Sequence, residues 1–205
     1  YFPYQADFRG RKYTVSSFLT PQGTEPAKAL LTFGEGLPIE NEEQKDWLAI
    51  HGANCAGVDK VSFEERIKWV LDNEENIIKS AELGLDYDWW TKFDDAWLFF
   101  AFCLEWATLK RKGLGYVSHL PIALDGSNNG LQHYSAMLRC PIGGKGTNLT
   151  AEETPQDIYQ EVADVVIREC TKLADLDDPM AKKWLDSGLI NRKMTKRPVM
   201  VVPYG

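Results

Sequence analysis

The chain has 205 residues, of which 44% are hydrophobic and 12% aromatic, so it carries enough apolar material for a packed core, and intrinsic disorder is disfavoured. Its longest uncharged apolar run, residues 96–103, is too short to span a bilayer. The four cysteines are too widely spaced for a zinc site and are expected to be reduced thiols. The whole chain has a net charge of −7. Residues 41–109 hold 15 acidic and 6 basic side chains, a net of −9, whereas residues 182–197 hold 6 basic and 1 acidic.

The pattern of apolar and turn residues predicts an α+β chain that is mostly helical. Ser62 followed by Glu65 is a capping box, which marks the start of a helix. A later helix over 94–109 should carry an apolar face made of Trp97, Phe100, Ala101, Leu104 and Ala107. In chain order we expect a strand over 13–19, a helix over 26–33, helices through 41–109, a strand over 116–124, and helices over 131–139, 155–173, 180–186 and 191–201.

One carboxylate follows an apolar run. Residues 120–124 are predicted to be a buried strand that leads into Asp125, Gly126 and a polar segment ending at Gly130. An aspartate beside a glycine carbonyl suits Mg²⁺, which prefers oxygen ligands and keeps several waters. Transfer of phosphoryl groups to a growing chain commonly uses two such ions. The alternative is a turn in which backbone amides satisfy the oxygens of Asp125.

A second block lies at the C-terminus. Arg192 and Lys196 are four residues apart, so on a helix they share one face and match the charge of a triphosphate. Tyr204 lies about two turns further on, where it can stack against a base or a sugar. The alternative is an exposed basic helix, and Pro198 and Pro203 should bend or break it.

A third block is the charged segment 7–11, in which Arg9 and Arg11 flank Gly10. The two guanidinium groups can face a phosphate backbone that comes close to the main chain at the glycine. An ordinary charged turn is the alternative.

Together these blocks make the chain resemble the single-subunit, bacteriophage-type DNA-directed RNA polymerases, whose core the mitochondrial and chloroplast enzymes share. The matching segments are DFRGR at 7–11, LTPQG at 19–23, KALL at 28–31, WLAIHGANCAG at 47–57, LPIALDGS at 120–127, GLQH at 130–133, QDIY at 156–159, and Arg192-x3-Lys196-Arg197 followed by Val199, Met200, Tyr204 and Gly205.

The resemblance implies a fragment of a right-hand polymerase fold. Residues 1–40 and 116–142 would be palm, 41–115 a helical acidic insertion in the palm, and 143–205 the start of the fingers. The implied activity is DNA-templated RNA synthesis from ribonucleoside triphosphates, in transcription of phage genes, with two Mg²⁺ ions in the complete enzyme.

The resemblance also implies roles for single residues. Asp125 matches the first catalytic metal-binding aspartate, with the Gly126 carbonyl as a neighbouring ligand. Lys196 matches a catalytic lysine that contacts the triphosphate and can protonate pyrophosphate, and Arg192 matches an arginine that holds phosphate. Tyr204 matches the tyrosine that monitors the sugar and closes the site.

Nucleic-acid contacts are implied for Arg9, Gly10, Arg11 and His133, with a DNA template and an RNA product as partners. We expect a monomer without membrane contact, in the cytoplasm of an infected bacterium or, alternatively, in a mitochondrion or chloroplast. The sequence begins without Met and stops inside an apparent motif at Tyr204 and Gly205, so we expect a fragment cut at both ends. Because the family's second metal-binding aspartate is not in this sequence, we expect the fragment to be inactive alone and to bind metal weakly.

Two alternatives stay open. A family A type DNA polymerase typically has a glutamate five residues after the aspartate, where it crowds a 2′-hydroxyl. Gly130 stands there instead and leaves room for ribose. A non-catalytic nucleic-acid-binding module would need a basic surface but not Asp125, and the acidity of 41–109 does not suit it.

Overall fold

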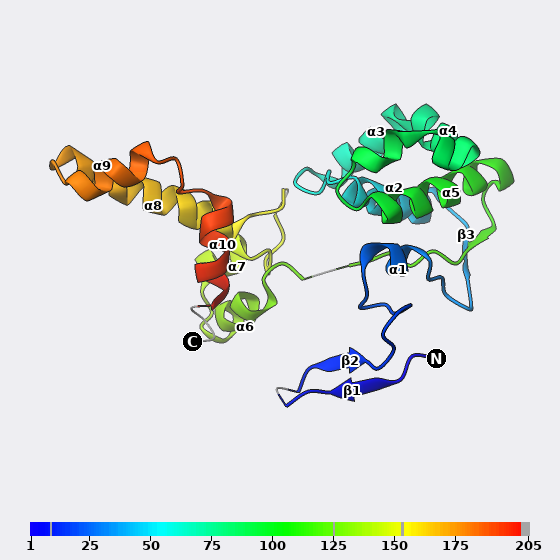
Figure 1. Cartoon of the computed structure of the whole chain (residues 1–205), viewed down its shortest axis with the longest axis horizontal. Helices are drawn as coiled ribbons and strands as arrows, with labels where there is room; N and C mark the ends of the chain where they lie inside the picture. The colour runs from blue at the N-terminus through cyan, green and yellow to red at the C-terminus, as the bar shows by residue number, and fades with distance from the viewer. Residues whose placement is uncertain (9, 125, 153, 202–205) are drawn as a thin grey trace. The chain divides into compact units, whose positions relative to one another are not determined.

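The computed structural model describes residues 1–8, 10–124, 126–152 and 154–201. They form two compact units, Tyr1–Leu124 and Asp125–Gly205. Each unit is built mainly of helices, and the described strands form two small antiparallel pairs in the first unit (Figure 1). The prediction of a mostly helical α+β chain is therefore confirmed. In the part of the chain that the structure describes, every helix is too short or too polar to cross a membrane.

The first unit begins with a hairpin. Strands β1 (Tyr4–Ala6) and β2 (Lys12–Thr14) pair antiparallel, with Tyr4 opposite Thr14. The predicted strand over 13–19 is wrong beyond Thr14, because the chain turns there and the amide of Thr14 donates to the side chain of Gln22 at 2.7 Å. The short helix α1 (Glu25–Ala29) follows, and β3 (Leu37–Ile39) pairs antiparallel with the distant strand β4 (Tyr116–Ser118).

The helices predicted within 41–109 are present. They are α2 (Glu42–Cys55), α3 (Phe63–Asp72), α4 (Glu74–Leu83) and α5 (Ala96–Lys112), with the 3-10 turns η1 (Gly84–Asp86) and η2 (Asp88–Lys92) before α5 (Figure 1). The capping box at the start of α3 is confirmed: the Ser62 hydroxyl accepts the amide of Glu65 at 3.2 Å, and the Glu65 carboxylate accepts the amide of Ser62 at 3.0 Å. These bonds satisfy two amides that a helix start leaves without an intrahelical partner.

The core of the first unit lies between α2, α3, α4 and α5. Its largest fully buried side chains are Leu48, Val70, Ile77, Phe99, Phe102 and Trp106. The predicted apolar face of α5 is wrong, because Phe99, Phe102, Cys103, Trp106 and Leu109 point into this core instead. Helix α5 is apolar almost all round, so its sequence contains little information about which side the neighbouring helices cover.

The predicted buried strand over 116–124 is wrong in its second half. Strand β4 ends at Ser118, and residues 119–124 have no regular structure. Leu124 is 82% exposed and Ile122 is 40% exposed. Pro121 has no amide to donate to a ladder, and β3 pairs only as far as Ser118, so this apolar run has no strand partner among the described residues.

The second unit contains α6 (Asn129–Met137), α7 (Pro141–Gly146), α8 (Ile158–Asp175), α9 (Pro179–Asp186) and α10 (Arg192–Val201). Helices α8 and α9 pack as a hairpin, and α10 packs back against α8 (Figure 1). Both α8 and α9 begin at an aspartate cap, Asp157 and Asp178, whose carboxylates accept amides of the first helical turn. The predicted helices over 131–139, 155–173, 180–186 and 191–201 are confirmed, with ends shifted by up to three residues.

Candidate functional site

Three of the predicted site residues lie outside the described residues. They are Asp125, predicted to bind metal, Tyr204, predicted to contact the incoming sugar, and Arg9, predicted to contact nucleic acid. Their roles remain predictions. The segments next to them are described, and the second unit brings several of the remaining site residues onto its helices.

Helix α6 begins shortly after Asp125. Its cap, Asn128, has a left-handed backbone with φ 56°, which turns the chain from the exposed Gly126 into the helix. Gly130 lies half-buried in the first turn of α6, and His133 lies exposed in the next turn. The Gln132 side chain donates to the backbone oxygen of Thr147 at 2.7 Å, which fastens α6 to the end of α7. The first turn of α6 is thus held in place within the second unit.

Metal ligands are sparse in the described parts of the chain. No cluster of three or more His, Cys, Asp or Glu side chains there has a geometry suited to a metal ion. All four cysteines are free thiols, as expected. The carboxylate predicted to hold Mg²⁺ belongs to Asp125, outside the described residues, and the predicted second ligand is the backbone carbonyl of Gly126.

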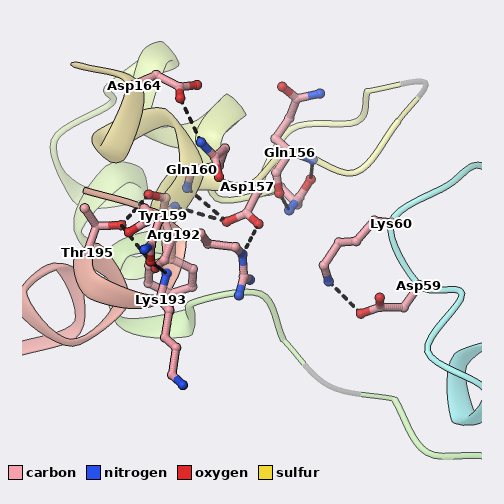
Figure 2. A network of polar contacts seen from close by, with 12 residues as sticks. Asp59, Lys60, Gln156, Asp157, Tyr159, Gln160, Asp164, Arg192, Lys193 and Thr195 are labelled. Carbon is pink, nitrogen blue, oxygen red and sulfur yellow. Dashed lines mark hydrogen bonds and ion pairs between the residues drawn. The ribbon is translucent and has the colours of Figure 1, made fainter. Parts of the chain in front are cut away.

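Arg192, at the first position of α10, is held by Asp157 across the α8–α10 contact. The Nε of Arg192 donates to Oδ2 of Asp157, and the Arg192 side chain remains 40% exposed (Figure 2). The other oxygen of Asp157, Oδ1, accepts the amides of Tyr159 at 3.1 Å and Gln160 at 3.4 Å. One carboxylate therefore caps α8 and pairs with the arginine at the same time.

The ion pair with Arg192 favours the charged form of the Asp157 carboxylate. Partial burial alone would raise the pKa of Asp157, but the hydrogen bond and charge of Arg192, with the two backbone amides, outweigh burial and hold the pKa below its ordinary range. Asp157 is therefore an anion at neutral pH. The Arg192 guanidinium also lies over the Tyr159 ring, 5.4 Å from its centroid, an attractive cation–π geometry.

Lys196 lies one turn after Arg192 and is exposed. Helix α10 continues through Pro198 to Val201, so Pro198 does not break it. Thr195, between the two cations, is buried, and its hydroxyl donates to the backbone oxygen of Tyr159 at 2.7 Å (Figure 2). This bond fixes the first turn of α10 on α8, so Arg192 and Lys196 stand on a continuous, anchored helix. Pro203 lies outside the described residues.

Asp7, Phe8, Gly10 and Arg11 lie between strands β1 and β2 of the hairpin. The amide of Gly10 donates to the backbone oxygen of Asp7 at 3.0 Å, and the amide of Arg11 donates to the Asp7 carboxylate at 3.0 Å. Gly10 has φ 81°, a left-handed conformation that glycine adopts without strain. The Arg11 side chain is exposed. The alternative of a charged turn describes the local structure, and an exposed turn remains compatible with contact to phosphates.

Sequence reasoning missed the residues that hold Arg192. Asp157 and Tyr159 were matched only as part of the segment 156–159, and Thr195 was not singled out. An aspartate just before an amphipathic helix is a detectable cap signal. Its pairing with an arginine 35 residues later has no such signal, because it depends on how α10 packs against α8.

Comparison with known proteins identifies the family. The profile of the DNA-dependent RNA polymerase family matches residues 39–205. The chain is 45% identical to the DNA-directed RNA polymerase of Enterobacteria phage K11, over all of this chain and 25% of the phage protein. It is 44% identical to T7 RNA polymerase of Escherichia phage T7, over all of this chain and 26% of that protein. The mitochondrial DNA-directed RNA polymerase of Mus musculus is 38% identical, over all of this chain and 17% of that protein.

The chain belongs to the family of single-subunit, phage-type DNA-dependent RNA polymerases. It spans about a quarter of the length of the phage relatives that it matches. The resemblance seen in the sequence is thereby confirmed at the level of the family.

Proposed function

We propose that the chain is part of an enzyme that synthesises RNA on a DNA template from ribonucleoside triphosphates, in transcription of phage genes. Membership of the polymerase family over residues 39–205 supports this proposal. The structural observation that carries it is the start of α10. There Arg192 is held by its ion pair with Asp157, and the exposed Lys196 lies one turn further along the helix. Two fixed cations at this spacing suit a triphosphate.

In this proposal the chain forms part of a right-hand fold. Residues 1–40 and 116–142 belong to the palm, 41–115 are an insertion in the palm, and 143–205 begin the fingers. The acidity of 41–109 is consistent with an insertion that does not face nucleic acid. The same acidity weakens the alternative of a pure nucleic-acid-binding module.

The reaction joins a nucleotide to the RNA end. The 3′-hydroxyl loses its proton to solvent and its oxygen attacks the α-phosphorus. A new P–O bond forms, and the bond to the oxygen that bridges to the β-phosphate breaks, so that pyrophosphate leaves. Arg192 and Lys196 neutralise charge that builds up on the leaving pyrophosphate, and the Lys196 ammonium can give it a proton. The hydrogen bond from Thr195 to the backbone oxygen of Tyr159 anchors the helix turn between these two groups.

Asp125 and the carbonyl of Gly126 would hold Mg²⁺, since both are oxygen ligands of the kind this ion prefers. When bound, two Mg²⁺ ions would lower the pKa of the attacking hydroxyl and neutralise charge on the phosphates. Helix α6 begins shortly after these ligands in the sequence, and the hydrogen bond from Gln132 to the backbone oxygen of Thr147 fastens it to the end of α7.

Gly130 and Tyr204 are the proposed sensors of the sugar. A glycine in the first turn of α6 leaves volume for the 2′-hydroxyl, the one group that separates ribose from deoxyribose. A glutamate at this position would fill that volume. Gly130 thus favours RNA synthesis over the alternative of a family A type DNA polymerase.

The proposed partners are a DNA template and an RNA product, bound through Arg9, Gly10, Arg11 and His133. We propose that the protein is a monomer. We place it in the cytoplasm of an infected bacterium, because phage polymerases are among the relatives. A mitochondrion is the alternative, because mitochondrial polymerases also match the whole chain, and a chloroplast is a further one.

The proposal is tested by primer extension with a complete polymerase polypeptide that contains these residues. An RNA primer on a DNA template is supplied with Mg²⁺ and either ribo- or deoxyribonucleoside triphosphates. We expect ribonucleotide incorporation, and a loss of at least about 100-fold in Asp125→Asn, since a metal ligand is removed. Asp86→Asn, at an exposed position of η1, is the matched control and should retain full activity.

Other outcomes point elsewhere. Extension with deoxyribonucleotides alone would move the protein to the DNA polymerases. A folded protein that binds the primer–template but does not extend it would be a binding module. Full activity of Asp125→Asn would remove this residue from the metal site.

A further inference from the structure

Arg192 uses only its inner nitrogen to meet Asp157. The donor is Nε, and the two terminal nitrogens make no hydrogen bond to the part of the chain that the structure describes. A guanidinium has five N–H donors, so four remain for another acceptor. The side chain is 40% exposed, which leaves its outer edge accessible to solvent and to a ligand.

The carboxylate that holds Arg192 is itself immobilised. Oδ1 of Asp157 is tied to the first turn of α8 by the amides of Tyr159 and Gln160, so Oδ2 has one orientation available. The preceding residue, Gln156, exchanges two hydrogen bonds with the side chain of Asn148, at 2.7 and 2.8 Å. The side chain of Asp157 is therefore held in one position by its neighbours.

Hydrogen bonds connect the Asp157 region to helix α6, which follows Asp125 in the sequence. Asn148 follows Thr147, whose backbone oxygen accepts the side chain of Gln132 on α6. A continuous series of bonds therefore runs from α6 through residues 147–148 to Gln156, Asp157 and Arg192, all within the second unit (Figure 2 shows its last part). The series joins the two parts of the unit to which the proposed reaction assigns metal and phosphate.

We propose that Asp157 is a positioning residue for nucleotide binding: it holds Arg192 by Nε so that the terminal nitrogens are presented to the triphosphate. The inference rests on the proposed function of Arg192. Without Asp157 the arginine would sample many rotamers and would have to be ordered each time a nucleotide binds. The cation–π contact with Tyr159 restricts the same side chain from a second direction.

The test uses the complete polymerase and the variant Asp157→Asn. Asparagine is as good a helix cap as aspartate, so α8 keeps its start while Arg192 loses its charged acceptor. We expect KM for ribonucleoside triphosphates to rise between about 3- and 10-fold, the cost of ordering one long side chain. The affinity for the primer–template should stay unchanged, because Asp157 and Arg192 are not assigned to it. The kcat should fall as well, because Arg192 also neutralises the charge that builds up on the leaving pyrophosphate.

Asp178→Asn is the matched control. Asp178 caps α9 in the same way, accepting the amides of Met180 at 2.8 Å and Ala181 at 2.9 Å, and it has no arginine partner in the described residues. Its KM should equal that of the unaltered enzyme. If Asp157→Asn does not fold, Asp157→Ser, which also keeps a capping oxygen, takes its place.

Arg192→Ala distinguishes the phosphate-binding role of Arg192 from the positioning role of Asp157. If Arg192→Ala leaves KM unchanged, the proposed role of Arg192 fails. If Arg192→Ala raises KM but Asp157→Asn behaves like Asp178→Asn, only the positioning role is overturned. A lower KM in Asp157→Asn would also overturn it, since Asp157 would then compete with phosphate. In the Arg192→Ala background, Asp157→Asn should have no further effect on KM.

Discussion

His51 lies in the middle of α2 and is only 3% exposed. Its ring is close to Cys55, with 3.7 Å between Nε2 and Sγ. Burial lowers the pKa of His51 to about 4 and raises the pKa of the Cys55 thiol to about 12, with smaller contributions to the thiol from Asp95 and Glu25. Both groups are therefore neutral at pH 7, which suits a pair in the core and not a nucleophile and its base.

We predict that His51 makes the first unit sensitive to mild acid. The unfolded chain protonates His51 near its ordinary pKa of 6.5, whereas the folded chain resists protonation until about pH 4. The contribution to stability is thus complete above pH 6.5 and is lost as the pH falls toward 4, by about 3 kcal/mol. Urea unfolding of the chain between pH 7.5 and 4 measures it.

His51→Gln is the control for this prediction, because glutamine does not titrate. The variant should be less stable at neutral pH but should lose less stability between pH 6.5 and 4 than the unaltered chain. An identical pH dependence for the two proteins would show that other groups cause the acid sensitivity.

At the level of elements, α2 packs closely against α5 at Gly52. A Cβ at this position would lie 2.3 Å from Cζ of Phe102, a fully buried ring on α5. Within an isolated helix, alanine is favoured over glycine by about 1 kcal/mol. Here the ring cannot move aside without disturbing the core, so packing should outweigh propensity.

We therefore predict that Gly52→Ala lowers the free energy of unfolding by about 2 kcal/mol, as overpacking of a core does. Chemical denaturation followed by circular dichroism measures the change. Gly34→Ala is the matched control, because a Cβ there would meet no atom within 4 Å. A Gly52→Ala chain as stable as the control would mean that α2 and α5 can separate at little cost.

At the level of the whole molecule, the two units differ in how much apolar surface they bury. The core cluster lies in the first unit, whereas among the described residues of the second unit the buried apolar side chains are Ala163, Ala181 and Ile190. The second unit relies more on polar contacts such as Asp157 to Arg192 and Thr195 to Tyr159. A few partly buried polar contacts stabilise a unit less than a large buried apolar core does.

We predict that amide hydrogens in α8, α9 and α10 exchange with solvent faster than those in α2 and α5. Helices with few buried apolar contacts open locally at a lower free energy. Hydrogen–deuterium exchange of the 205-residue chain, followed by mass spectrometry, measures both sets of helices together. Equal protection in the two units would contradict the prediction and would require a contribution that the polar contacts alone do not explain.

Local signals in the sequence were sufficient for most helices and for the family. The capping box of Ser62 and Glu65 marks the start of α3, because a cap uses only residues within one turn. The helix over 180–186 is expected to end at Gly188, and the helix over 191–201 is expected to carry the basic cluster, both from residues close together in the sequence. The segments that match the polymerase family are also read directly from the order of residues.

Only the tertiary structure decided which surfaces meet. Residues 120–124 look like a strand, but a strand needs a partner, and the described chain offers none beyond Ser118. The buried side of α5 depends on where α2 and α4 lie, since its sequence is apolar almost all round before its basic last turn. The pairing of Asp157 with Arg192 spans 35 residues and forms because α10 packs against α8. Backbone preferences act over a few neighbouring residues, whereas the contacts that position a side chain depend on how distant segments pack.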